Sequence, residues 1–396
     1  MNKMQESFKT QTKPNDLPNR VFHHIIGKSS GSTIVFFAGI HGNERAGVEA
    51  LNNTLKNISE NKVCGEVYAV FGNLKALKKN KRYLKTDLNR LWTSKQIKEL
   101  QQKRILNEEE QEQKDLLSLI EHILHSTKAP IYFIDLHTTS SKTIPFITIN
   151  DALINRKFSR CFSVPVILGI EEYLEGPLLS YLNTLGYVAI GFESGQHTDP
   201  EAIKNCEAFI HLALKQGGQL HINNITQYHN QLVMASKDNT CVFEVIYKYH
   251  IKSTEEFVMQ DGFESFQTIK KGILLAQANG KNIYADYNAQ LFMPLYQKSG
   301  NDGFFIIKPI PEFFLKLSEI LRRIKADTLL TILPGISWHN KDLGVLKANL
   351  LVTRFMAKSV FHLFGYRNKQ LDKNHLLLYN RERVSKTRMY KDELWY

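Results

Sequence analysis

Short apolar runs alternate with amphipathic segments over the first 220 residues. The predicted buried strands span residues 33–38, 66–71, 131–137, 145–149, 165–168 and 188–192. Apolar residues at helical spacing predict helices over residues 46–58, 152–161, 177–185 and 199–215. Strands that alternate with helices are typical of an α/β domain, so we expect a mainly parallel mixed sheet flanked by helices.

A longer helical pattern runs from residue 94 to residue 126 and carries an acidic stretch at 108–112. We interpret this stretch as a solvated helix face, which is the usual setting of a charge run. The preceding segment, residues 82–90, has too few apolar positions for a core element, so we predict a loop there.

The pattern changes after residue 222. Residues 223–310 contain short β-rich runs separated by Gly-containing turns, which predict a small antiparallel, barrel-sandwich-like β domain. Residues 311–396 show Leu, Ile and Phe at helical spacing, and an amphipathic basic helix is predicted over 350–361. The predicted division is therefore 1–222, 223–310 and a helical, basic C-terminal extension at 311–396.

Composition supports a globular chain with a sizeable core. The chain has 396 residues, of which 43% are hydrophobic and 23% charged. The polar first 20 residues lack a signal-peptide core, and no apolar run is long enough to span a bilayer. The four cysteines are far apart and form no CxxC pair. We therefore expect a soluble, cytoplasmic protein with reduced thiols.

The positive charge is concentrated at one end of the chain. Of the net charge of +12, +8 lies in residues 311–396, where 16 Lys or Arg face 8 Asp or Glu. A basic segment suits anionic partners such as nucleic acid or a membrane surface. The sequence has no Gly-rich phosphate loop, zinc finger or RNA-binding aromatic motif, so we expect no nucleic-acid partner.

Candidate metal ligands follow the first predicted strand. His41 and Glu44 lie three positions apart in a Gly-flanked turn between that strand and a helix. His137 and Glu193 also fall at predicted strand ends, and the carboxyl ends of parallel strands form the usual ligand site of such sheets. Imidazole and carboxylate groups are ligands of Zn²⁺, and a hydrolytic site uses three of them.

Four motifs in this order resemble the succinylglutamate desuccinylase/aspartoacylase family. They are His41-Gly42-Asn43-Glu44, residues 82–90, Asp135-Leu136-His137 and Phe192-Glu193. The resemblance covers residues 35–193 by motif and extends in outline to the β domain. It implies a zinc-carboxypeptidase-like scaffold and a zinc-dependent amidohydrolase, with no counterpart for residues 311–396.

The resemblance also implies roles for single residues. His41, Glu44 and His137 match the ligands of one Zn²⁺ per chain. Glu193 matches the general base that activates water and then protonates the leaving amine, and Arg82 matches the residue that stabilises the oxyanion.

Two further positions match the residues that hold the substrate's carboxylate, namely Asn89 and Arg90. Asp87 is interpreted as a structural partner of an arginine, and Asp135 as a support for the local backbone or a ligand. His197, four residues after Glu193, is left outside the metal shell. Aspartoacylases carry an extra Arg at the position of Asn183 here, so the substrate is less defined than the reaction.

Our hypothesis is a zinc-dependent hydrolase that cleaves an amide bond, or alternatively an ester bond, in a small N-acyl amino acid or similar carboxylate. The alternatives are a carboxypeptidase-type peptidase and a non-catalytic protein that binds anions or a membrane surface. The partner expected is a small anionic acylated substrate. Membrane contact through the basic tail is not favoured, and homo-oligomerisation is left open.

Overall fold

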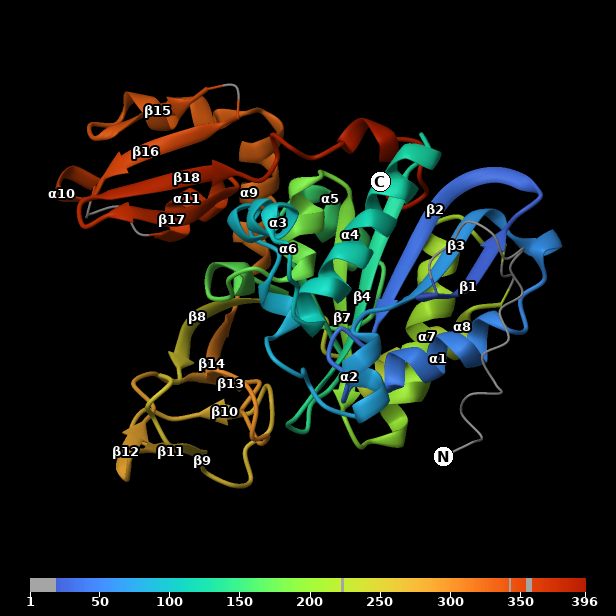
Figure 1. Ribbon diagram of the computed structural model, residues 1–396. Helices are drawn as coiled ribbons and strands as arrows, with labels where there is room; N and C mark the ends of the chain where they lie inside the picture. Colours follow the sequence, from blue (N-terminus) through green and yellow to red (C-terminus); the bar gives the residue numbers. More distant parts are fainter. Residues whose placement is uncertain (1–18, 222–223, 342, 354–357) are drawn as a thin grey trace.

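The computed structural model describes residues 19–221, 224–341, 343–353 and 358–396. One large mixed sheet runs through most of it (Figure 1). In spatial order its strands are β1 (Val21–Ile26), β3 (Cys64–Phe71), β2 (Ser29–Ala38), β4 (Ile131–Thr139), β7 (Val188–Gln196), β5 (Phe146–Ile149), β6 (Val166–Leu168), β8 (Val242–His250), β14 (Asp302–Pro309), β13 (Ala289–Phe292) and β10 (Thr268–Ile269). The predicted α/β class with a mainly parallel mixed sheet is confirmed.

Helices cover both faces of the sheet's first half. The helices on one face are α1 (Ala46–Leu55), α5 (Leu153–Ser159), α7 (Pro200–Gln216) and α8 (Thr226–Ala235). On the other face lie α4 (Glu108–Ser126) and α6 (Leu178–Thr184). Successive strand residues enter opposite cores: Phe36 packs under the first set of helices and Phe37 under the second.

Parallel pairing brings the ends of β2, β4 and β7 together. β2 pairs in parallel with β3 and β4, and β4 pairs in parallel with β7. His137 on β4 and Glu193 on β7 are direct register partners. The sheet thereby places side chains that are far apart in the sequence at one edge, as the sequence analysis expected.

Two differences from the expected elements concern the N-terminal half. β1 was not predicted, and it pairs antiparallel with β3. The long helical pattern is two helices, α3 (Ser94–Gln102) and α4, because a capping box of Asn107 and Glu110 starts a new helix. Three short helical elements lie between α1 and α3 in the sequence, namely η1 (Glu60–Lys62), α2 (Leu74–Lys79) and η2 (Leu88–Arg90).

The large sheet continues into the β-rich region. β8 pairs in parallel with β6 and then begins an antiparallel series with β14, β13 and β10. A separate three-stranded sheet contains β12 (Lys281–Tyr284), β11 (Leu274–Ala278) and β9 (Phe257–Met259). The boundary after residue 222 and the barrel-sandwich comparison remain predictions.

The helical prediction for residues 311–396 is wrong in part. Helices are present as α9 (Glu312–Arg323), η4 (Ala326–Ile332), α10 (Leu350–Thr353), α11 (Lys358–Leu363) and η5 (Thr387–Tyr390). Four other segments form an antiparallel sheet in the order β15 (Ile336–Asn340), β16 (Val345–Asn349), β18 (His375–Asn380) and β17 (Tyr366–Asp372), seen at the upper left of Figure 1. We call residues 311–396 the C-terminal module.

Long-range packing overrides the helical pattern in this module. Leu346, Leu378 and Tyr366 lie on three neighbouring strands and share one buried cluster. Gly365, at a positive φ of 84°, connects α11 to β17. The helix predicted over 350–361 is α10 and part of α11, and its centre at 354–357 lies outside the described residues.

The end of the chain returns to the large sheet. Tyr390 is fully buried, and its hydroxyl donates to the Ile131 carbonyl at 2.5 Å and accepts from the Val188 backbone N–H at 2.9 Å. None of the helices in the described part of the chain combines the length and apolar character needed to cross a membrane.

Candidate metal centre and active site

A tight turn after β2 presents the first two candidate ligands. Gly39 ends the strand with a positive φ of 70°, a conformation that favours glycine. A Cβ at Gly42 would lie 2.2 Å from the carbonyl carbon of Ala76, so only glycine allows this approach. The turn buries His41 and Glu44, which are 4% and 3% exposed.

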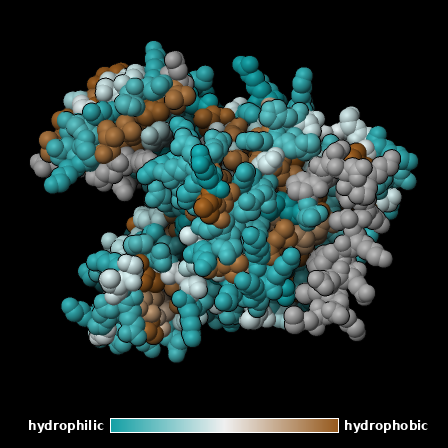
Figure 2. Space-filling view, in the orientation of Figure 1, coloured by the Kyte–Doolittle hydropathy of each residue, from teal (hydrophilic) through white to brown (hydrophobic). Residues whose placement is uncertain are grey.

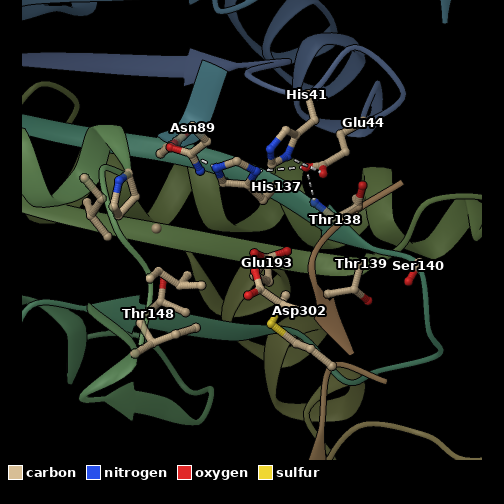
Figure 3. Close-up of a pocket in the computed structure, with 18 of the residues that line it drawn as sticks. His41, Glu44, Asn89, His137, Thr138, Thr139, Ser140, Thr148, Glu193 and Asp302 are labelled. Atoms are coloured by element: carbon tan, nitrogen blue, oxygen red, sulfur yellow. Dashed lines mark hydrogen bonds and ion pairs between the residues drawn. The ribbon is translucent and has the colours of Figure 1, made fainter. Parts of the chain in front are cut away.

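His41, Glu44 and His137 converge in the pocket shown in Figure 3, and one potential ligand atom from each lies within 4.8 Å of the others. The two carboxylate oxygens of Glu44 face separate imidazoles: Oε1 is 2.7 Å from His41 Nδ1, and Oε2 is 2.8 Å from His137 Nδ1. The sequence therefore predicted a group of residues that the fold brings together.

The Nε2 atom of each imidazole contacts a further carboxylate, a different one for each histidine. His41 Nε2 lies 3.1 Å from Asp87 Oδ1, and His137 Nε2 lies 2.8 Å from Asp135 Oδ2. A neutral imidazole that donates its Nε2 proton to such a carboxylate has an acceptor lone pair at Nδ1. Both Nδ1 atoms face the carboxylate of Glu44, which is itself an acceptor. Either a bound cation or protons on the Nδ1 atoms must therefore offset the repulsion between these acceptors. The donor set of two imidazoles and one carboxylate fits Zn²⁺.

The charges in this cluster change two pKa values strongly. Burial would raise the pKa of Glu44, but His41 and His137 hold it well below its usual range. Burial would lower the pKa of His137, but Asp135 and Glu44 raise it well above its ordinary value. The cluster therefore favours an ionised carboxylate next to positive charge, which is the environment that a divalent cation also provides.

Glu193 lies beside the cluster in the same pocket (Figure 3). It is 8% exposed, and its Oε2 has no hydrogen-bond partner among the described residues. Burial, together with the nearby charges of Glu44 and Asp135, raises its pKa from 4.5 to about 8. A buried carboxyl with a raised pKa is a typical candidate for proton transfer.

Arg82 enters the pocket from the loop before η2. Its Nη2 lies 3.0 Å from Asp87 Oδ2 and its Nη1 lies 3.8 Å from Glu44 Oε1. Burial opposes ionisation, but these two carboxylates raise the pKa of Arg82 above its ordinary value. Asp87 therefore contacts both Arg82 and His41, and the expectation that it holds an arginine is confirmed.

The acidic run on α4 organises this loop, so its interpretation as a solvated face is wrong. Glu109 is fully buried, and its carboxylate accepts the backbone N–H groups of Leu84, Lys85 and Thr86 at 2.6, 3.0 and 3.3 Å. Glu112 is 3% exposed and pairs with Arg20 at 2.8 Å. These acidic residues satisfy buried donors that the local sequence does not reveal.

The two residues matched to carboxylate binding also line the pocket. Asn89 Oδ1 accepts the backbone N–H of Leu178 at 2.9 Å, so part of its amide anchors α6. Arg90 Nη2 contacts Asp302 Oδ2 at 2.7 Å, while Lys248 Nζ contacts Asp302 Oδ1 at 2.9 Å. One aspartate between two cations leaves one surplus positive charge in this group.

Several lining residues were not predicted to belong to the site. Asp302, Leu295 and Gln297 reach the pocket from the β-rich region, for which the sequence predicted short strands and turns but no site residue. His197 lines it as well, with Nδ1 2.7 Å from the Thr138 hydroxyl and a buried Nε2 that has no partner in the described part of the chain. The spacing of His197 from Glu193 was the one available signal that it could line the pocket, and it was left outside the metal shell.

Asn183, the departure from the aspartoacylase pattern, is not among the residues that line the pocket. Its Oδ1 accepts from Asn155 Nδ2 at 2.5 Å, and its Nδ2 donates to the Leu179 carbonyl at 2.8 Å. Both groups are therefore engaged in the protein itself.

Comparisons with known proteins agree on one family. Residues 30–210 match the model of the succinylglutamate desuccinylase/aspartoacylase catalytic domain. A succinylglutamate desuccinylase of Photorhabdus laumondii is 38% identical over 78 residues, which cover 19% of this chain and 24% of the relative. A Pseudomonas fluorescens succinylglutamate desuccinylase is 37% identical over 75 residues, or 18% and 22% of the two chains. The aligned segments thus span less than a quarter of these relatives.

Solved structures extend the similarity in fold. A Vibrio parahaemolyticus structure named as a succinylglutamate desuccinylase aligns with a TM-score of 0.54 and 17% identity, covering 75% of this chain and 90% of that one. A product-bound structure of an ectoine utilization protein from Ruegeria pomeroyi aligns with a TM-score of 0.55 and 17% identity. The alignment covers 72% of this chain and 87% of that one. Residues 30–210 of this chain are therefore similar to the catalytic domain of the succinylglutamate desuccinylase/aspartoacylase family.

Proposed function

We propose that this protein is a zinc-dependent hydrolase of a small N-acyl amino acid or similar carboxylate. The observation that carries the proposal is the convergence of His41, Glu44 and His137 on one point beside Glu193. Each imidazole is also oriented by its own carboxylate. An amide is the bond favoured, and an ester remains the alternative.

His41, Glu44 and His137 would hold the ion, one per chain. When bound, Zn²⁺ supplies Lewis acidity and lowers the pKa of water, which is the chemistry that amide hydrolysis needs at neutral pH. Asp87 and Asp135 orient the two imidazoles through their Nε2 atoms.

Glu193 would act as the general base and then the general acid. Its carboxylate takes a proton from the attacking water and delivers it to the leaving amine. In the metal-free pocket its pKa is about 8 because burial outweighs the positive groups around it. A cation at the neighbouring cluster favours the ionised form and lowers this value into the range where Glu193 accepts a proton.

Arg82 and Arg90 would each interact with a different negative group of the substrate. Arg82 lies closer to Glu44 and would stabilise the oxyanion that develops at the scissile carbonyl. Arg90, with Lys248 and Asp302, forms a group with one surplus positive charge, which suits the carboxylate of the substrate. Asn89 lines the same pocket.

The β-rich region favours small substrates over long peptides. Met293, Leu295, Gln297 and Asp302 line the pocket together with residues from the N-terminal half of the chain. A pocket enclosed from two regions of the fold accommodates a compact ligand better than an extended chain. This arrangement supports the deacylase over the peptidase alternative.

Hydrolysis of a panel of N-acyl amino acids tests the proposal. The zinc-loaded full chain should release the free amine from at least one member, and Glu193→Gln should lower kcat about 100-fold or more while zinc remains bound. Glu201→Gln, on the exposed part of α7, is the matched control. Normal turnover by Glu193→Gln would contradict the assigned role, and turnover of long peptides alone would favour a peptidase.

A further inference from the structure

The wall of the pocket away from the metal cluster contains a buried acidic residue, Glu171. It belongs to η3 (Ile170–Glu172), which follows β6, and it lines the same pocket as His137 and Glu193. β6 lies three positions from β4 in the sheet order β4-β7-β5-β6. Three strand spacings amount to about 14 Å, so Glu171 faces a part of the ligand distant from the scissile bond.

Glu171 is almost fully buried and incompletely paired. It is 1% exposed, and neither carboxylate oxygen accepts a hydrogen bond within the described residues. Its Oε1 forms an ion pair with Arg381 Nη2 at 2.9 Å, but none of the ion pairs found in the described chain involves Oε2. A buried carboxylate oxygen without a donor is costly, which suggests that a ligand supplies the donor.

The C-terminal module fixes Glu171 in this position. Arg381, at the end of β18, contacts Glu171 and also Glu172 Oε1 at 3.0 Å. Arg367 on β17 donates a hydrogen bond to the Glu171 backbone carbonyl. Two arginines of the module therefore hold η3 in place, at a position where Glu171 lines the pocket and its Oε2 has no hydrogen-bond partner among the described residues.

The polar groups that line the pocket from the neighbouring β5 and α6 are uncharged. Thr148 and Asn150 come from the end of β5, and Ser180 comes from α6. Arg82 and Arg90, the arginines that line the pocket, belong to the 82–90 segment rather than to this wall. A second carboxylate of a ligand would thus meet an anionic acceptor here and be repelled.

We infer that Glu171 is a specificity-determining residue that selects a substrate carrying a hydrogen-bond donor at the end distant from the scissile bond. An ammonium group fits best, because a hydrogen bond between two charged partners is the strongest available. The substrate would then be an N-acyl amino acid whose side chain or acyl chain ends in an amine. This inference rests on the proposed function for the kind of ligand and extends it to the ligand's second end.

Binding of matched probes tests the inference without relying on turnover. The zinc-loaded full chain in a Glu193→Gln background is titrated calorimetrically with Nα-acetyl-lysine and with N-acetyl-2-aminoheptanoate, whose side chain has the same length but ends in a methyl group instead of an ammonium group. A second pair, 4-aminobutyryl-glycine and pentanoyl-glycine, places the donor on the acyl chain. In one of the pairs the amine should bind about tenfold tighter or more.

Two matched variants assign the preference to Glu171. Glu171→Gln should reduce the preference to within about twofold, whereas Glu172→Gln, which changes the neighbouring carboxylate, should retain it. Arg381→Met should weaken the preference as well, because Glu171 loses its anchor. Arg383→Met is the control, since Arg383 pairs with Asp327 inside the C-terminal module.

The outcomes separate this inference from the proposed function. Equal affinity within both pairs, tighter binding of the methyl-ended probes, no detectable binding of any probe, or a preference that survives Glu171→Gln would each overturn the inference. A failure of the wild-type enzyme to hydrolyse any N-acyl amino acid would instead overturn the proposed function, and the binding preference would still be measurable.

Discussion

At the scale of single residues, two buried carboxylates of one pocket experience opposite electrostatic environments. Glu44 has imidazoles at both oxygens, which hold its pKa well below the usual range although burial acts against this. For Glu193 burial dominates, and its pKa rises to about 8. Environment thus separates one residue suited to binding a cation from another suited to moving a proton.

The raised pKa of Glu193 predicts a pH-dependent stability of the metal-free protein. Between 4.5 and about 8 the folded state retains a proton that the unfolded state releases. The stabilising contribution is therefore present in full below 4.5 and is lost as the pH rises toward about 8. Relative to Glu193→Gln, the wild type should show a falling Tm over pH 5 to 8 in the presence of a chelator.

Thermal unfolding of both proteins across this pH range is the measurement. Glu201→Gln serves as the control, because its side chain is exposed at the surface and should follow the wild type. Parallel profiles of the wild type and Glu193→Gln would contradict the raised pKa.

At the scale of elements, α4 stabilises the loop over residues 82–90. This loop bears three residues that line the pocket and also Asp87, which contacts two of the pocket's residues. Glu109 receives three successive backbone N–H groups from residues 84–86, directly between Arg82 and Asp87. The helix is thus connected to the candidate active site through one buried carboxylate.

Removal of this carboxylate should destabilise the loop and lower activity. Glu109→Ala leaves buried backbone donors without a partner, which costs about 2 kcal/mol or more in the free energy of unfolding. Since Arg82 and Arg90 belong to the same loop, kcat/KM should fall about tenfold or more. Denaturant unfolding and steady-state kinetics measure the two effects.

Glu121→Ala on the exposed side of the same helix is the matched control and should change the free energy of unfolding by less than about 0.5 kcal/mol. If Glu109→Ala behaved like this control, the loop would not depend on the carboxylate.

The sequence predicts site residues at strand ends, but it does not predict site residues that depend on contacts between distant segments. His41, His137 and Glu193 could be located because strand ends have clear apolar patterns and parallel strands bring those ends together. The burial of Glu109 could not be predicted, since an acidic run on a helix looks the same whether it faces solvent or caps a distant loop. Asp302 and Glu171 likewise depend on contacts between regions far apart in the sequence.

At the scale of the whole molecule, buried charges connect the C-terminal module to the large-sheet region. Arg322 of α9 is fully buried at its side chain and pairs with Asp151 at 2.7 Å and Glu382 at 3.0 Å. Asp151 follows β5 and also binds Arg156. Figure 2 shows that hydrophilic residues cover much of the visible face of the molecule.

Asp151 should make the attachment of the module sensitive to acid. Burial opposes its ionisation, but Arg156, Arg322 and Arg381 hold its pKa below the ordinary value of 3.8. Its stabilising contribution is therefore present above about pH 4 and is lost as the pH falls toward the folded pKa. Asp151→Asn should cost about 3–5 kcal/mol at neutral pH, because it leaves buried arginines without their anion.

The difference in unfolding free energy between Asp151→Asn and the wild type should shrink as the pH falls below 4. Asp261→Asn, at an exposed turn, is the control and should be nearly neutral. A difference that is independent of pH would show that the effect of Asp151 is not electrostatic.

The fold of the C-terminal module was the least predictable part. Its apolar residues fit helical spacing, but Leu346, Leu378 and Tyr366 are buried only because four short strands pair with one another. The central pairing, between β16 and β18, joins residues 26 to 34 positions apart, and such pairing leaves no local signal that distinguishes the strands from an amphipathic helix. By contrast, the parallel sheet of the first half repeats a regular pattern and was predicted almost strand by strand.

The metal content of the purified full-length protein tests the central claim most directly. Under conditions that spare bound metal, the wild type should contain about one zinc per chain, and the His41→Ala, His137→Ala double variant should contain almost none. His229→Ala, which alters a histidine hydrogen-bonded to Ser163 outside the cluster, should retain the ion. A wild type that takes up no zinc, or a double variant with unchanged zinc content, would contradict the account.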